Sequence, residues 1–103
     1  MDTETKVYTR YSILTEDINR GEVASLCREH RIDCTLYAGV GLFNGNIEES
    51  LTVVHLAPLE ANVREEIKAL ARDIKAENNQ REIWITEETV TLKKLLDNAP
   101  ATG

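Results

Sequence analysis

The sequence is poor in the residues that mark specialised architecture. Its 103 residues include two cysteines, two prolines, one tryptophan and one phenylalanine, and there is no low-complexity tract. No run of eighteen apolar residues occurs, so we expect no membrane-spanning helix. Residues 1–6 are polar and acidic and do not resemble a signal peptide. We therefore expect a cytoplasmic protein, in the host cytoplasm if it is viral, whose thiols are reduced.

Basic residues are also scarce. Twelve Lys and Arg face eighteen Asp and Glu, which gives a net charge of -6. This balance argues against a nucleic-acid polymer as partner, because phosphate binding needs clustered cations. Half of the excess lies in residues 32–59, which hold three acids and no Lys or Arg. Mimicry of DNA would need long carboxylate rows, and the adjacent Glu48 and Glu49 favour an acidic, solvated hairpin instead.

Catalytic and ligand-binding motifs are lacking. There is no P-loop and no zinc-protease or serine-hydrolase signature, and Gly39-Val40-Gly41 lacks the rest of a dinucleotide fingerprint. Cys27 and Cys34 form no metal-type spacing with the two histidines, so we expect no metal and no cofactor. Cys27 follows a helical apolar pattern and is predicted to pack in the core. His30 is predicted near the end of that helix, and His55 as a hydrogen-bonded strand residue.

The hydrophobic pattern predicts one domain spanning residues 1–103, with 1–6 and 98–103 loose. Asn44-Gly45 indicates a tight hairpin turn, and Asn19 a helix start. Asn78-Asn79 indicates a helix end. The predicted elements are strands at 7–14, 33–43, 47–57 and 81–86, helices at 19–31 and 60–78, a short fifth strand at 89–92 and a helical turn at 93–97.

This order of elements is β-α-β-β-α-β, which predicts an α+β, ferredoxin-like fold with a four-stranded antiparallel sheet and both helices on one face. The opposite sheet face is then left open. Strand alternation places most of the aromatic residues there, with one basic residue and two glycines that leave room beside them. These candidate ligand-binding residues are Tyr8, Arg10, Tyr37, Gly39, Gly41, Phe43 and Trp84.

An exposed aromatic face indicates an interface or a ligand site, and three explanations compete. The face packs against a second copy of the chain, it stacks RNA bases, or it binds a small molecule with Arg10 as the counter-ion of an anionic group. The base-stacking explanation is disfavoured, because the stretch from Tyr37 to Phe43 lacks the leading basic residue and the aromatic spacing of RNA-recognition modules.

We therefore predict a small homo-oligomeric protein that self-associates through its open sheet face. It binds a small anionic molecule such as a nucleotide, or a protein partner, in a regulatory role. Small acidic chains of this kind are common among phage accessory and anti-defence proteins. The alternative is a cofactor-free monooxygenase or isomerase of the dimeric ferredoxin-like type, with His55 or Glu49 as the base.

Overall fold

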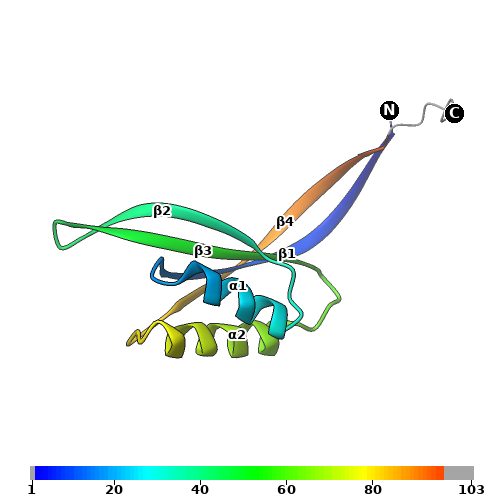
Figure 1. Cartoon of the computed structure of the whole chain (residues 1–103). Coiled ribbons are helices and arrows are strands. Elements are labelled where there is room, and N and C mark those ends of the chain that lie inside the picture. Colours follow the sequence, from blue (N-terminus) through cyan, green and yellow to red (C-terminus); the bar gives the residue numbers. More distant parts are fainter. Residues whose placement is uncertain (1, 97–103) are drawn as a thin grey trace, which may run out of the picture.

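A computed structural model describes residues 2–96 of the chain. Two helices lie side by side on one face of a four-stranded sheet (Figure 1). The elements are β1 (Asp2–Glu16), α1 (Arg20–Glu29), β2 (Thr35–Phe43), β3 (Asn46–Pro58), α2 (Arg64–Glu77) and β4 (Trp84–Leu96). The strand order is β2-β3-β1-β4, with every neighbouring pair antiparallel. The ferredoxin-like fold predicted from the sequence is confirmed.

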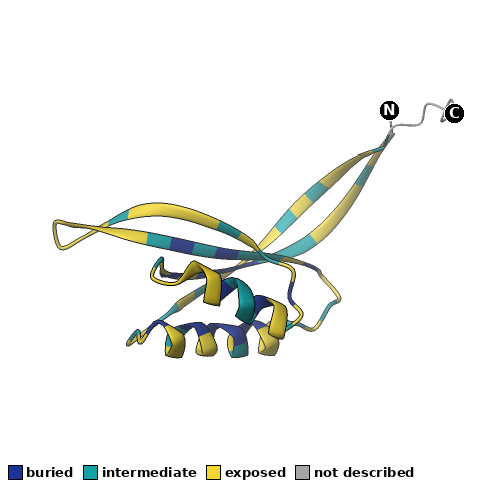
Figure 2. Cartoon of the chain, in the orientation of Figure 1, coloured by how far each residue is buried: buried dark blue, intermediate teal, exposed yellow. Residues whose placement is uncertain are grey.

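The core lies between the middle of the sheet and the two helices (Figure 2). Alternate residues of β1 and β3 point toward the helices, since both strands have one covered face. The largest fully buried side chains are Ile13, Leu51, Ile67, Leu70, Ile74, Val23 and Val53. Burial of these apolar side chains stabilises the packing of the helices on one face of the sheet. The opposite face of the sheet is not covered by either helix.

Local signals in the sequence set the helix and hairpin ends. The Asn19 side chain accepts a hydrogen bond from the Glu22 backbone at the start of α1. Asn44 and Gly45 both have positive φ, 51° and 79°, as a two-residue hairpin turn requires. Asn79 adopts φ 53° just after α2 and reverses the chain there. These three predictions are confirmed.

Strand β4 differs from its prediction. Residues 84–96 form one strand, so the separate fifth strand at 89–92 is wrong, as is a helical turn over 93–96. Asp2–Lys6 are not loose but belong to β1, where they pair with the second half of β4. No Gly, Pro or Asn interrupts residues 84–96, so nothing stops the strand while a partner continues beside it. Residues 97–103, and with them the predicted loose end at 98–103, lie outside the described residues.

The two outer parts of the sheet extend past the helices (Figure 1). Asp2–Val7 pairs with β4 alone, because pairing between β1 and β3 begins at Tyr8. This part, with Thr91–Leu96, is a two-stranded ribbon that we call the arm. The β2–β3 hairpin also projects, so Val40 and Leu42 on its helix-facing side remain exposed. The register of this hairpin is continuous through both of its glycines, Gly39 and Gly41.

His30 connects the two helices at the C-terminal end of α1. Its Nδ1 lies 2.9 Å from Glu66 Oε2 and its Nε2 lies 2.6 Å from Asp73 Oδ2, both on α2. The hydrogen bond to Glu66, followed by the bond to Asp73, raises the pKa of His30 above its ordinary value of 6.5. The protonated ring therefore holds the helices together by two charge-assisted contacts.

This contact predicts a pH-dependent stability. Because the folded pKa is raised, its contribution is full below about pH 6.5 and disappears as the pH rises through the folded value. Urea unfolding should show the free energy of unfolding falling between pH 6 and pH 8, by about 1 kcal/mol or less, since both carboxylates are exposed. The His30→Gln variant, which cannot titrate, should lose this slope. An identical slope in both proteins would contradict the assignment.

Neither α1 nor α2 is long and apolar enough to cross a membrane. Within residues 2–96 no group of three or more His, Cys, Asp and Glu side chains is arranged to hold a metal ion.

Candidate functional site

The strand register defines which side chains share the open face. Because Ile13 and Val53 point to the helices, their neighbours along each strand point away from them. The open face therefore carries Tyr8, Arg10, Ser12 and Leu14 of β1, Thr35, Tyr37, Gly39, Gly41 and Phe43 of β2, Thr52, Val54 and Leu56 of β3, and Trp84, Thr86, Glu88 and Val90 of β4. All seven candidate ligand-binding residues lie on this face.

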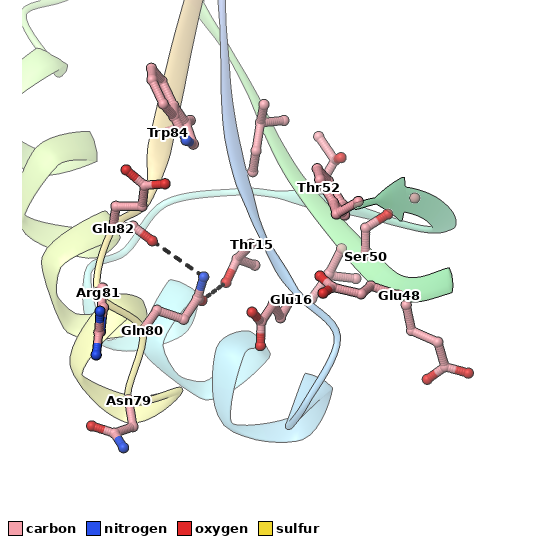
Figure 3. Close-up of a pocket in the computed structure, with 15 residues that line it drawn as sticks. Thr15, Glu16, Glu48, Ser50, Thr52, Asn79, Gln80, Arg81, Glu82 and Trp84 are labelled. Carbon is pink, nitrogen blue, oxygen red and sulfur yellow. Dashed lines mark hydrogen bonds between the residues drawn. The ribbon is translucent and has the colours of Figure 1, made fainter. Parts of the chain in front are cut away.

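A hollow of about 680 Å³ lies at one end of this face. Trp84 on β4 and residues of β3 border it from opposite sides of β1 (Figure 3). We call it the Trp84 hollow; its lining is Leu14, Thr15, Glu16, Gly41, Phe43, Glu48, Glu49, Ser50, Leu51, Thr52, Asn79, Gln80, Arg81, Glu82 and Trp84. The size suits a small organic molecule.

Two exposed aromatic rings contribute to the hollow. The Trp84 residue is 64% exposed and Phe43 is 56% exposed, although both are large and apolar. The Phe43 ring lies over Gly41: a Cβ atom on Gly41 would stand 2.6 Å from Phe43 Cε2. Gly41, which has no Cβ atom, thus lets the Phe43 ring lie close to the strand.

A polar network fixes the wall of the hollow that follows α2. The buried Asn78 donates from Nδ2 to Thr15 Oγ1 at 3.1 Å and to the Glu16 carbonyl at 3.3 Å. Thr15 also donates to Gln80, whose Nε2 donates to the Glu82 carbonyl at 3.4 Å (Figure 3). Hydrogen bonds to a buried amide hold this loop against the end of β1, so the wall is formed before any ligand arrives.

The charge of the Trp84 hollow is predominantly negative. Four of its lining residues are glutamates, namely Glu16, Glu48, Glu49 and Glu82, and Arg81 is the one basic residue among them. Carboxylates accept hydrogen bonds from amino and hydroxyl groups, and they repel phosphates. The arrangement suits a planar ring that stacks on the aromatic side chains and carries hydrogen-bond donors.

The sequence-predicted site residues do not converge on a single hollow. Gly41, Phe43 and Trp84 line the Trp84 hollow, whereas Arg10 and Tyr37 line a second one of about 420 Å³ at the centre of the face. In that second hollow, Arg10 Nη2 lies 2.9 Å from Glu88 Oε2. The charge of Arg10 is therefore already balanced by a neighbouring strand. The two remaining candidates lie apart: Tyr8 borders a third hollow near the arm, and Gly39 faces Ser50 across the strands.

The two candidate bases have different positions. His55 lies on the helix-facing side of β3, where its Nδ1 is 2.7 Å from the Asp33 carbonyl oxygen. This matches a hydrogen-bonded strand histidine, and His55 lines neither of the two main open-face hollows. Glu49 does line the Trp84 hollow. Neighbouring Glu48 faces the open side by strand alternation, so the two carboxylates are not a side-by-side pair.

The sequence did not predict the lining residues that come from the end of β1 and from the connection between α2 and β4. Glu16 ends β1, and Gln80, Arg81 and Glu82 belong to the connection after α2. Asn78-Asn79 indicated a helix end there, but where the following loop lies depends on the contact between Asn78 and Thr15, 63 residues apart. No local pattern reports a contact over that separation.

No protein-family model matches the chain, and no curated protein matches it. Solved structures do. The CPII protein of Thiomonas intermedia, a nitrogen regulatory PII-like protein bound to ADP, AMP and bicarbonate, superposes with a TM-score of 0.59 at 8% identity, covering 90% of this chain and 100% of that one. A phage SAM lyase in complex with S-methyl-5′-thioadenosine gives 0.61 at 11% identity, covering 84% and 90%.

The GlnK–ATP complex of B. subtilis is a further match, with a TM-score of 0.53 at 14% identity and coverage of 80% of this chain and 82% of that one. At these identities the similarity establishes the ferredoxin-like fold shared with PII-like proteins. The chain thus has the architecture of a group of small α+β proteins whose solved examples include ligand-bound regulatory and phage proteins.

Proposed function

We propose that this chain is a small-molecule-binding protein, of a regulatory or phage accessory kind, that takes a purine nucleoside or nucleotide in the Trp84 hollow. The observation that carries the proposal is the hollow itself: about 680 Å³, bordered by the exposed rings of Trp84 and Phe43. Three structures of the same fold hold adenine nucleosides or nucleotides, which supports this ligand class. We place the protein in the cytoplasm, or in the host cytoplasm if it is viral.

The negative charge of the hollow predicts which purine ligands bind more tightly. Four glutamates and one arginine line it, so an uncharged nucleoside meets less repulsion than a nucleotide does. The hypothesis of an anionic ligand held by Arg10 is weakened, because Arg10 is paired with Glu88 and lines another hollow. A bound nucleotide would need cations from Arg81 or from a second copy of the chain.

We further propose that the protein is a homo-oligomer whose open sheet faces pack against other copies. Large apolar side chains remain exposed on this face, among them Leu14, Tyr37, Leu56 and Trp84. The arm also supports association, because an isolated two-stranded ribbon is marginally stable in water. A second copy of the chain would cover both the exposed apolar side chains and the arm. A protein partner of another kind is the alternative occupant.

Fluorescence titration tests the ligand proposal, since Trp84 is the single tryptophan of the chain. S-methyl-5′-thioadenosine, AMP and ADP are added separately at low and high salt. We expect a saturable change in Trp84 emission, with the uncharged nucleoside binding more tightly than ADP and the difference shrinking at high salt. No change with any of the three compounds would contradict the proposal.

Substitution of Gly41 predicts a selective effect on the hollow. In Gly41→Ala the new methyl group displaces the Phe43 ring, which is the movable end of an exposed side chain. Stability should change by about 1 kcal/mol or less, because a strand glycine is itself mildly unfavourable. Nucleoside affinity should fall several-fold by the same titration. Gly21→Ala on α1 is the control, since its methyl group meets nothing within 4 Å and Gly21 does not line the hollow; equal losses in both variants would contradict the assignment.

A second candidate is a cofactor-free enzyme acting in the same hollow. The observation that favours it is that Glu49 lines the helix-facing part of the hollow with Thr15 and Leu51, where it could take a proton from a bound substrate. His55 is disfavoured in this role by its contact with the Asp33 carbonyl. If the protein converts a bound nucleoside, Glu49→Gln should abolish conversion while leaving binding intact, as followed by chromatography of the nucleoside.

A further inference from the structure

Two thiols lie together on the helix side of the molecule, away from the open face. Cys27 is in the last turn of α1 and is buried, whereas Cys34 directly precedes β2 and is half-buried. Both line one hollow of about 330 Å³, together with Ala24, Arg28, Ile32, Asp33 and Leu36. The two cysteines therefore border the same surface hollow.

The backbone between the two cysteines doubles back after α1. Arg31 adopts a positive φ of 56° and turns the chain. The Ile32 amide then donates to the Cys27 carbonyl at 3.0 Å, and Cys34 Sγ donates to the Ile32 carbonyl at 3.5 Å. These bonds hold the segment that carries Cys34 against the end of α1.

The thiols also interact with each other. Hydrogen bonding between them is the largest influence on both: it lowers the pKa of Cys27 and raises the pKa of Cys34. The nearby His30 lowers the pKa of Cys27 further. Because a lower pKa gives more thiolate, Cys27 is the better nucleophile of the pair.

We propose that Cys27 and Cys34 are a dithiol modification site, which a hydroperoxide converts into an intrachain disulfide. The Cys27 thiolate attacks one peroxide oxygen, the O–O bond breaks, and the departing oxygen takes a proton, leaving a sulfenic acid. Cys34 sulfur then attacks Cys27 sulfur, and the S–O bond breaks. Hydroxide leaves with the Cys34 proton as water. The two thiols lose two electrons and the peroxide gains them.

The disulfide would tie the last turn of α1 to the start of β2. Asp33 directly precedes Cys34 inside this loop, and its carbonyl accepts the hydrogen bond of His55 Nδ1 on β3. The modification therefore constrains the edge of the sheet and closes a short loop, which should raise the midpoint of thermal unfolding.

The test treats the full chain with hydrogen peroxide, blocks free thiols, and digests it with trypsin. Cleavage after Arg28 and Arg31 separates the two cysteines, so a disulfide joins peptide 21–28 to peptide 32–64. We expect an intact mass lower by two hydrogens, this linked pair, and a single-chain band on a non-reducing gel. Cys34→Ser should instead accumulate oxygen on Cys27.

Independent addition of oxygen to each cysteine of the wild type, without the linked peptides, would overturn the proposal. A linkage found only between two chains would overturn it equally. Because Cys27 is buried and its substitution can impair folding, the decisive measurement is the peptide map of the unmodified sequence, which needs no variant.

Discussion

Replacing Trp84 by alanine should weaken nucleoside binding by roughly 5- to 150-fold, the range that removal of one base-stacking ring produces. Trp84 is 64% exposed and borders the hollow on the side of β4, so its loss removes a stacking surface and leaves the core intact. Because the variant has no tryptophan, calorimetric titration with S-methyl-5′-thioadenosine replaces fluorescence. The Trp84→Phe variant should recover most of the affinity, since it keeps a stacking ring.

Tyr37→Ala is the matched control for this prediction. Tyr37 is an exposed aromatic residue on the same face, but it lines the central hollow with Arg10. Its loss should leave the nucleoside affinity within about twofold of the wild type, because it does not border the Trp84 hollow. If Tyr37→Ala loses binding and Trp84→Ala keeps it, the ligand occupies the central hollow and our assignment of the site is wrong.

The second large effect is expected from Val54→Glu, which should convert the oligomer to a monomer at micromolar concentration. Val54 lies at the centre of the open face, between Ser12 and Thr35 on the neighbouring strands. Packing that face against another copy would bury the new carboxylate without a partner, at a cost of several kcal/mol. Analytical ultracentrifugation of the variant and the wild type measures the change.

Val40→Glu provides the same chemical change on the other side of the sheet. Val40 is on β2, is 70% exposed, and points to the helix side of the projecting hairpin. We expect this variant to keep the oligomeric state of the wild type. Dissociation by Val40→Glu together with an unaffected Val54→Glu protein would show that copies meet through the hairpin and not through the open face.

Much of the fold could be predicted from local patterns in the sequence. The positive φ required at Asn44 and Gly45 fixed the hairpin, and the period-2 alternation around Leu36 and Ile85 placed the aromatic residues on one face. These features depend on neighbouring residues, which a single sequence displays directly.

The arm and the complete hollow could not be predicted, because both depend on contacts between distant residues. Asp2–Lys6 read as a loose polar segment, and only pairing with Leu92–Leu96, far along the chain, makes it a strand. The projection of the hairpin past the helices also depends on where α1 begins: it starts at Arg20, just after β1 ends opposite Ser50, and Leu42 lies beyond that point and stays exposed. The ion pair between Arg10 and Glu88 could not be predicted either, because it depends on the register between β1 and β4.

Native mass spectrometry of the wild-type chain purified from cells tests the central claim most directly, that the open face is completed by another copy and holds a small molecule. We predict a species whose mass is a multiple of the 11.6 kDa chain, with additional mass corresponding to a bound nucleoside or nucleotide. A species of 11.6 kDa that carries no bound mass at micromolar concentration, and gains none when S-methyl-5′-thioadenosine is added, would contradict the account.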